Sequence, residues 1–130
     1  MKFQPDSTDG VNVITRHEAG RVWIAGTPWA HSLLVPWSGE VLAWRPSRFE
    51  DLLAADFERI VALKPEVVIF GSGRRLRFLP AASLRALIER RIGVETMDNA
   101  AACRTYNVLA SEGRSVVAAL LLETATGGVA

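Results

Sequence analysis

The chain has 130 residues, the length of one domain, which is enough to bury a hydrophobic core without disulfide bonds. Fifteen basic and 14 acidic residues leave a net charge of +1, which argues against a nucleic-acid binder and against a charged, disordered chain. A single cysteine and two histidines exclude an internal disulfide framework and argue against a metal site, and no motif points to a cofactor.

The first half of the chain is predicted to be rich in β-strands. Alternating apolar and polar residues predict two strands joined by the turn His17–Gly20, where the glycine supplies a positive φ. Gly26-Thr27-Pro28 is expected to end the second strand. With two further apolar runs, the predicted strands span residues 11–15, 21–25, 31–35 and 40–44. We expect these strands at an edge of the main sheet or in a second small sheet.

A short helix is predicted next. Ser47 has the properties of an N-cap, and Glu50 three residues later completes a capping box. The helix is expected to end near Asp56. Its apolar face, at helical spacing, consists of Phe49, Leu52 and Leu53. The next stretch, residues 57–63, is compatible with a helical turn or with an extended connector.

The second half of the chain has the rhythm β-α-β-α-β. A helix is predicted from Pro80 to the C-cap Gly93, and a second helix over residues 100–112 is capped by Asp98 or Asn99. Apolar runs, of the kind found in strands buried on both faces, predict strands over residues 66–70, 94–97 and 116–122. The pattern predicts an α/β domain in which helices pack on a mixed sheet.

The domain organisation is expected to be simple. Residues 1–10 are polar and predict a flexible N-terminal arm, residues 11–123 a single α/β domain, and residues 124–130 a flexible tail. The N-terminal residues lack the layout of a signal peptide. No apolar run approaches the roughly 20 residues of a membrane span, so we expect a cytoplasmic protein without membrane insertion.

The first candidate site is the glycine loop that follows the strand at 66–70. Gly71, Ser72 and Gly73 are followed by Arg74, and open α/β sheets bind ligands at the carboxyl ends of their strands. Glycines let backbone N–H groups approach an anion, and the arginine adds positive charge. The loop has neither the lysine of a P-loop nor the third glycine of a dinucleotide fingerprint. The alternative is a tight turn that binds nothing.

The second candidate site begins at Asp98 and continues into the following helix. A helix N-terminus favours anions and lowers thiol pKa values, so Cys103 beside Arg104 is a candidate activated thiol. Arg104 and Asn107 lie about one turn apart and are expected to line the same cleft as the glycine loop or to tie the loop ends together. The alternatives are structural, with Asp98 as a helix cap, Cys103 as a small buried hydrophobe and Arg104 bonded to loop carbonyls.

Two compositional biases bear on partners. Residues 61–130 hold nine basic and six acidic residues, so the positive excess of this half favours a small anion or an acidic protein surface over nucleic acid. The four tryptophans lie in the first half, where they form either a recognition surface or a core. They are Trp23, Trp29, Trp37 and Trp44.

Three segments of the second half resemble a known family. Residues 69–73, 93–98 and, most specifically, 101–114 are similar to a domain family of unknown function that includes the mitochondrial respiratory complex I assembly factor 3 and small bacterial and archaeal proteins. The family usually has threonine at the positions of Ser72 and Asn99, and both departures are chemically mild. The resemblance spans about residues 11–123 and implies a three-layer α/β fold with a central mixed sheet.

The resemblance implies no established reaction. Its eukaryotic members act through protein partners during assembly of a respiratory complex, which implies for this chain a non-enzymatic, bacterial binding module with a protein partner. The alternative is a binding protein or enzyme for a small anionic metabolite, with its site at Gly71–Gly73 and Asp98–Asn107. A third interpretation is that these residues only maintain the fold, in which case Arg104→Ala lowers stability without changing any binding.

Overall fold

The computed structural model describes residues 10–123, so the predicted arm (except Gly10) and the predicted tail lie outside the described residues. Five strands form the central sheet: β4 (Leu33–Pro36), β5 (Leu42–Ala43), β6 (Val67–Gly71), β7 (Gly93–Met97) and β8 (Val116–Leu120). Their spatial order is β5-β4-β8-β6-β7. β6 runs parallel to β7 and β8, whereas β4 runs antiparallel to β8 and β5. The predicted mixed sheet is therefore confirmed.

A second, antiparallel sheet consists of β1 (Ile14–Glu18), β2 (Arg21–Ile24) and β3 (Thr27–Trp29). The predicted hairpin is present as β1 and β2. Its turn is shorter than predicted, however, because His17 and Glu18 still pair with β2 and only Ala19 and Gly20 form the turn. Gly20 has a φ of 77°, as such a tight turn requires.

The second strand ends where Gly26-Thr27-Pro28 predicted, since β2 stops at Ile24, but the sequence did not predict the third strand, β3, that follows. Gly26 turns the chain at a φ of 85°, and Thr27 and Pro28 then pair with β2. β3 lies at the edge of the small sheet, where the N–H that proline lacks is not needed by a further strand.

The first α-helix begins later than predicted. In place of a helix over 47–56, the chain forms a single 3₁₀ turn, η1 (Phe49–Asp51), followed by α1 (Ala54–Val61), and Ser47 caps neither. The Leu53 N–H donates to Asp56 Oδ2 at 2.8 Å, and Arg45 Nε and Nη2 donate to the same carboxylate at 2.8 and 2.7 Å. The buried Asp56 thus sets the start of α1 through contacts that helical periodicity does not encode.

The remaining helices lie close to their predicted positions. α2 (Arg85–Glu89) is preceded by a 3₁₀ turn, η2 (Ala81–Leu84), so the helix predicted from Pro80 is shorter and less regular. α3 (Asn99–Ser111) is capped by Asp98, whose Oδ1 accepts the Ala101 N–H at 2.9 Å. Of the two predicted caps, Asp98 is therefore the correct one.

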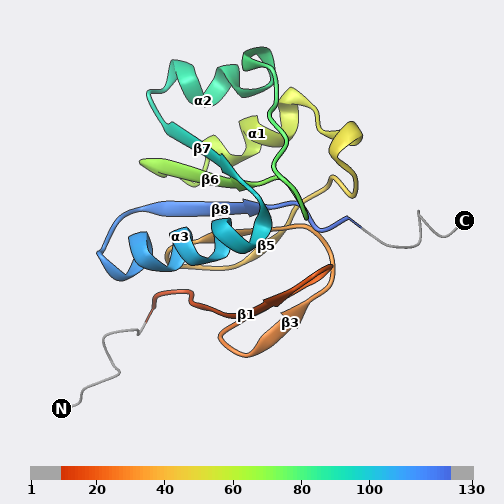
Figure 1. Ribbon diagram of the computed structural model, residues 1–130. Helices are drawn as coiled ribbons and strands as arrows, with labels where there is room; N and C mark the ends of the chain where they lie inside the picture. The colour runs from red at the N-terminus through yellow and green to blue at the C-terminus, as the bar shows by residue number, and fades with distance from the viewer. Residues whose placement is uncertain (1–9, 124–130) are drawn as a thin grey trace, which may run out of the picture.

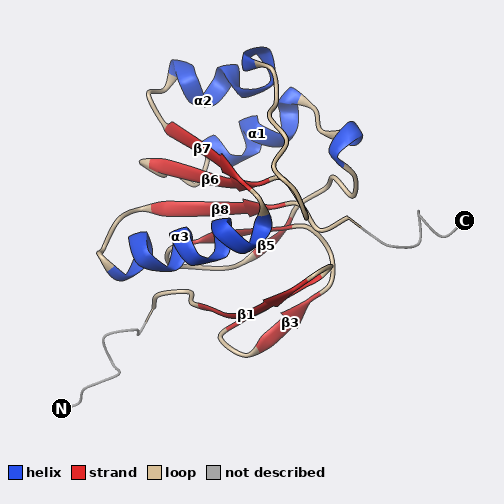
Figure 2. Cartoon of the chain, viewed as in Figure 1, coloured by secondary structure: helices blue, strands red, loops and turns tan. Residues whose placement is uncertain are grey.

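The two faces of the central sheet are covered by different elements. Successive residues of β8 point to opposite faces, because side chains alternate along a strand. Val116, Ala118 and Leu120 pack in one core cluster with α3 and the small sheet, whereas Val117 and Ala119 pack in a second cluster with α1 and α2. Figures 1 and 2 show α1 and α2 above the sheet, and α3 with the small sheet below it. The fold therefore has three layers.

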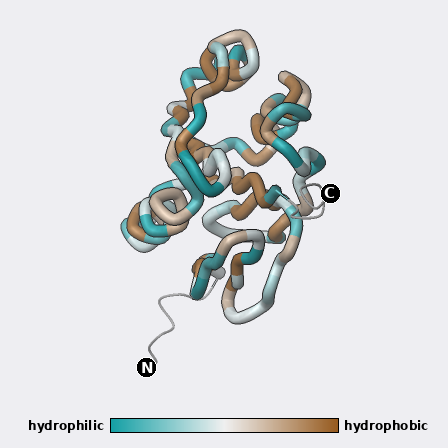
Figure 3. Tube along the Cα trace, turned by 45° about the vertical axis from the view of Figure 1, so that its right-hand side comes forward, coloured by the Kyte–Doolittle hydropathy of each residue, from teal (hydrophilic) through white to brown (hydrophobic). Residues whose placement is uncertain are grey.

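The tryptophans belong largely to these clusters. Trp44 is buried, with its ring edge-on to Phe57 and Phe70 at centroid distances of 5.5 and 6.2 Å. Trp29 and Trp37 are partly buried against the other cluster. Figure 3 shows the hydrophobic segments of the central strands in the middle of the molecule. The packing thus favours the core interpretation of these residues.

Asp56 is expected to make stability depend on acid pH. Burial raises the pKa of this carboxyl, but the hydrogen bonds from Arg45 and Leu53 outweigh burial and lower the pKa in the folded chain. Its stabilising contribution is therefore complete above the unfolded pKa of about 3.9 and is lost as pH falls through the folded pKa. We expect the free energy of unfolding of Asp56→Asn to fall less steeply than that of wild type as the pH is lowered, measured by urea unfolding at a series of pH values. The control Asp51→Asn should show the same pH dependence as wild type. A wild-type pH dependence in Asp56→Asn would contradict the prediction.

Candidate functional site

The glycine loop folds back on itself after β6. Ser72 is buried, and its hydroxyl donates to the Arg75 carbonyl at 2.8 Å while accepting the Arg77 N–H at 3.0 Å. The Ser72 N–H donates to the Met97 carbonyl at 2.8 Å, which joins the loop to the end of β7. Gly73 has a φ of 107°, a left-handed conformation that favours glycine. The hydroxyl of Ser72 is therefore engaged in holding the loop.

Asn99, the first residue of α3, ties three segments together. Its Nδ2 donates to the Leu121 carbonyl at 2.9 Å, and its Oδ1 accepts the Gly73 N–H at 3.2 Å. Its own N–H donates to the Gly73 carbonyl at 2.8 Å. A single side chain thus holds the glycine loop, the start of α3 and the end of β8 in one junction, which lies where β6, β7 and β8 end.

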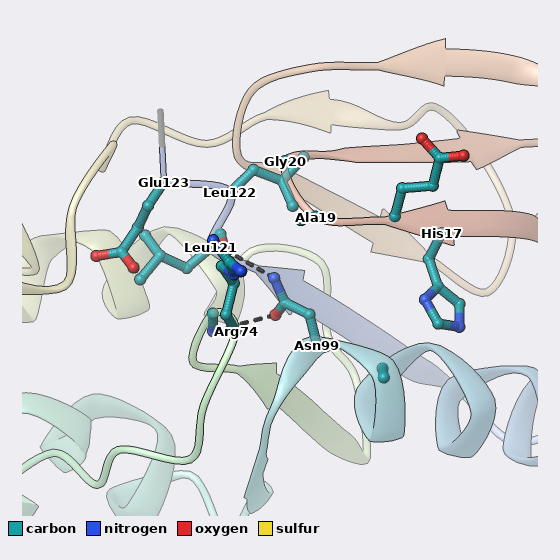
Figure 4. A pocket seen from close by; sticks show the side chains of 11 residues that line it. His17, Ala19, Gly20, Arg74, Asn99, Leu121, Leu122 and Glu123 are labelled. Carbon is teal, nitrogen blue, oxygen red and sulfur yellow. Dashed lines mark hydrogen bonds between the residues drawn. The ribbon is translucent and has the colours of Figure 1, made fainter. Parts of the chain in front are cut away.

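A pocket of about 250 Å³ opens between this junction and the turn of the β1–β2 hairpin, and we call it the hairpin pocket. Figure 4 shows the hairpin on one side and the start of α3 on the other, with Asn99 between them. The lining residues are His17–Gly20, Gly73, Arg74, Asn99, Ala100 and residues 121–123. The glycine loop and the helix start that the sequence singled out thus share one open pocket.

The charges around the hairpin pocket favour an anion. Glu18 forms an ion pair with Arg16, and Glu123 Oε1 lies 2.7 Å from Arg77 Nη2, so both acidic groups have partners. Within residues 10–123, no carboxylate pairs with the exposed Arg74. The carboxylate of Asp98 caps the N-terminus of α3 and offsets the partial positive charge of the helix end. The uncompensated positive charge at the rim is therefore that of Arg74.

The pair Arg77–Glu123 supports the junction from the far side of the glycine loop. Arg77 Nη2 also donates to the Ser72 carbonyl at 2.7 Å, and its guanidinium carbon lies 4.5 Å from the centre of the Phe49 ring. Burial raises the pKa of the Glu123 carboxyl, but hydrogen bonds from Arg77 and the Phe49 N–H outweigh burial and leave the pKa lowered. Glu123 is therefore held ionised, and it links the end of β8 to the loop and to η1.

Cys103 and Arg104 lie outside the hairpin pocket. The Cys103 thiol is 1% exposed in the core cluster beneath α3, and burial raises its pKa to about 12 despite the neighbouring Arg104. A thiol in this environment is not activated, because the reactive form is the thiolate. Arg104 is exposed on α3, so the expectation that it is buried against loop carbonyls is wrong. Only the other half of the predicted helix start, Asp98 to Ala100, belongs to the junction.

Asn107 has a different structural role from the one predicted. Its Oδ1 accepts the Ile14 N–H at 3.0 Å, and its Nδ2 donates to the Ile14 carbonyl at 2.8 Å. The side chain thus pairs with the backbone of β1 as a neighbouring strand would. Asn107 also lines a second hollow, of about 450 Å³, with residues 11–13 and the end of α3. It attaches the small sheet to α3 rather than lining the hairpin pocket.

We expect Asn107→Ala to lower the free energy of unfolding by about 1.5 kcal/mol, because both backbone groups of Ile14 lose their partner. The matched control is Arg104→Ala, three residues earlier on α3, which should change stability by less than about 0.5 kcal/mol because the side chain is exposed. Urea unfolding of both variants measures the difference. Equal losses in the two variants would contradict this assignment.

Several lining residues were not found from the sequence. His17 and Glu18 come from the hairpin, and Glu123 follows β8, so both segments are remote in sequence from the glycine loop. A usable signal existed for Glu123 alone, since it follows an apolar strand whose carboxyl end lies beside that of β6. The position of the hairpin carried no such signal, because the sequence left open which sheet it joins.

Within residues 10–123, no three His, Cys, Asp or Glu side chains are grouped so that they could hold a metal ion. No helix in that part of the chain is long and apolar enough to cross a membrane.

The fold and the matched residues identify the family. The chain belongs to the protein family of unknown function DUF498/DUF598, whose model matches residues 14–121. This finding confirms the resemblance drawn from the sequence.

Relatives of the chain include proteins of eukaryotes and bacteria. It is 38% identical over 83 residues to NADH dehydrogenase (ubiquinone) 1 alpha subcomplex assembly factor 3 of Bos taurus, a match that covers 62% of this chain and 45% of that protein. An uncharacterised protein of Rhodobacter capsulatus is 37% identical over 87 residues, covering 67% of this chain and 60% of its own length. The chain thus matches less than half the length of the bovine relative.

A crystal structure of a Bordetella parapertussis protein has the same fold. Its TM-score to this chain is 0.83 at 36% identity, and the match covers 88% of this chain and 98% of the other. The overall fold of this chain is therefore shared with that protein.

Proposed function

We propose that the chain is a non-enzymatic assembly-factor-like module that acts through protein partners, in the building of a respiratory complex. The observation that carries the proposal is the 83-residue match at 38% identity to an assembly factor for NADH dehydrogenase. The role of that relative is assigned to this chain by analogy.

The chemistry of the candidate residues supports a binding role over a catalytic one. The hydroxyl of Ser72 is engaged by the loop, and the thiol of Cys103 is buried with its pKa raised to about 12. A nucleophile needs a base within hydrogen-bond reach and access to substrate. Both side chains instead stabilise the fold. The surface is therefore the part of the molecule that would bind a partner.

Deleting the gene in the organism that carries it tests the proposal. We expect the fully assembled NADH dehydrogenase complex to decrease on native gels while partial complexes accumulate, and the wild-type gene to restore assembly. Mild crosslinking followed by affinity capture should recover subunits of that complex with the tagged chain. Normal assembly in the deletion strain would contradict the proposal.

The second candidate function is the binding of a small anionic metabolite in the hairpin pocket. It is favoured by one observation, the exposed Arg74 at the rim of a pocket of about 250 Å³, with which no carboxylate of residues 10–123 forms an ion pair. A thermal-shift screen against phosphorylated and carboxylated metabolites tests it. Arg74→Ala should abolish any stabilisation, whereas Arg104→Ala, outside the pocket, should retain it. Failure of every compound to stabilise the wild-type chain would contradict this candidate.

A further inference from the structure

The segment Arg74–Pro80, which we call the strap, connects the glycine loop to η2 and has an unusual polarity. From Leu76 to Pro80 its side chains alternate between exposed and partly buried positions. Arg77 and Leu79 are the partly buried ones, with Leu79 packed against the core cluster beneath α1 and α2. Leu76 and Phe78 point outward and are 49% and 71% exposed. Arg77 thus faces the protein, whereas Leu76 and Phe78 face the solvent together with Arg74 and Arg75.

This register is held by specific contacts of Arg77. Its Nη2 donates to Glu123 Oε1 and to the Ser72 carbonyl, each at 2.7 Å, and its backbone N–H donates to the Ser72 hydroxyl. The guanidinium also covers the Phe49 ring. Rotating the strap to hide Phe78 would break all four contacts, so the structure fixes Leu76 and Phe78 in their exposed positions. Phe78 is the most exposed large apolar side chain among residues 10–123.

The segment of the chain that carries these two side chains is basic. Between Gly71 and Ile88 the chain holds four arginines and no acidic residue. Arg77 is neutralised by Glu123, whereas Arg74, Arg75 and Arg85 are exposed. Apolar side chains that project from a positively charged segment match the chemistry of an anionic membrane surface, where apolar groups enter the interface and arginines bind lipid phosphates.

We propose that the strap docks this protein peripherally onto an anionic lipid surface, with Leu76 and Phe78 entering the interface and Arg74 and Arg75 binding phosphates. A bilayer receives projecting side chains without a preformed groove, which suits the projection of Phe78. No segment needs to span the bilayer, and no helix among the described residues could do so. This docking is independent of the protein partners proposed above.

Flotation with lipid vesicles tests the proposal. We expect the wild-type chain to float with vesicles of phosphatidylcholine and phosphatidylglycerol in equal parts, not with phosphatidylcholine alone, and to be released by high salt. Leu76→Ser/Phe78→Ser should weaken partition by at least about tenfold through lost apolar burial. Arg74→Gln/Arg75→Gln should weaken it by about tenfold or more through lost charge.

The matched control is Val108→Ser. Val108 is 54% exposed on α3, on the opposite face of the sheet, so its replacement should leave partition unchanged. Thermal unfolding of each variant checks that the fold is retained, which the exposure of all replaced side chains favours. The proposal is overturned if the wild-type chain does not float with anionic vesicles. An acidic protein surface would then be the better binding partner for the strap. It is also overturned if the Leu76→Ser/Phe78→Ser variant floats as well as wild type.

Discussion

Gly71→Ala is expected to lower the free energy of unfolding by about 3 kcal/mol. A Cβ at this position would overlap Asn99 Oδ1 and would lie 2.9 Å from Leu120 Cδ2 and 3.3 Å from Ala102 Cβ. The Asn99 amide could move aside only by giving up its hydrogen bonds to the Leu121 carbonyl and the Gly73 N–H. Chemical denaturation measures the loss.

Gly93→Ala is the matched control for this prediction. Gly93 begins β7, and a Cβ there would meet only Val67 Cγ2 at 3.7 Å and the Glu66 carbonyl at 3.9 Å, both ordinary contacts. We expect a change within about 0.5 kcal/mol. Similar losses of stability at the two glycines would mean that the close approach of Asn99 and Leu120 does not require a glycine at position 71. The close packing of the junction described above would then be wrong.

Arg77→Met is expected to cost about 2 kcal/mol of unfolding free energy, because it removes two charge-assisted hydrogen bonds and leaves Glu123 without its cation. The exposed Arg75 is the matched position, and Arg75→Met should change stability by less than about 0.5 kcal/mol. A double-mutant cycle of Arg77→Met with Glu123→Gln should give a coupling energy of about 1 kcal/mol. A coupling energy near zero would contradict the ion pair.

The pH dependence provides an independent check on the same pair. The pKa of Glu123 is lower in the folded chain than its ordinary value, so the pair stabilises the fold above the unfolded pKa. That contribution is lost as pH falls through the folded pKa. The stability difference between wild type and Arg77→Met should therefore shrink towards acid pH. A difference that stays constant would show that Arg77 acts through the Ser72 carbonyl and the Phe49 ring and not through Glu123.

The elements with strong local signals were predicted closely. The strand β6 and the helix α3 lie within a residue or two of their predicted bounds, because a continuous apolar run and an aspartate cap act over a few neighbouring residues. The helix predicted to begin at Ser47 was wrong because its position depends on a contact between distant residues. A capping box was present in the sequence, but Arg45 and the buried Asp56 set the start of α1 through a contact eleven residues apart.

The candidate site was predicted only in part. Gly73 and Arg74 line the hairpin pocket as the strand-end argument suggests, and Asp98 caps the helix beside it. Cys103 was singled out for its place near a helix N-terminus. Helical rotation turns it into the core instead, a direction that depends on how α3 packs on the sheet. Glu123 and Arg77 are 46 residues apart and meet only in the folded chain.

The amino-acid sequence by itself determined the number of domains expected, the α/β class, the family and the glycine loop, because these follow from composition, periodicity and a conspicuous run of residues around Cys103. Only the tertiary structure decided that the hairpin closes a pocket over that loop and that Cys103 is core. It also decided that Arg77 faces inward while Phe78 faces outward. The reason is physical: local patterns specify which residues prefer burial, but pairing between distant segments determines which of them obtain it. In the strap, the contacts of Arg77 with Ser72, Glu123 and Phe49 hold Leu76 and Phe78 in exposed positions.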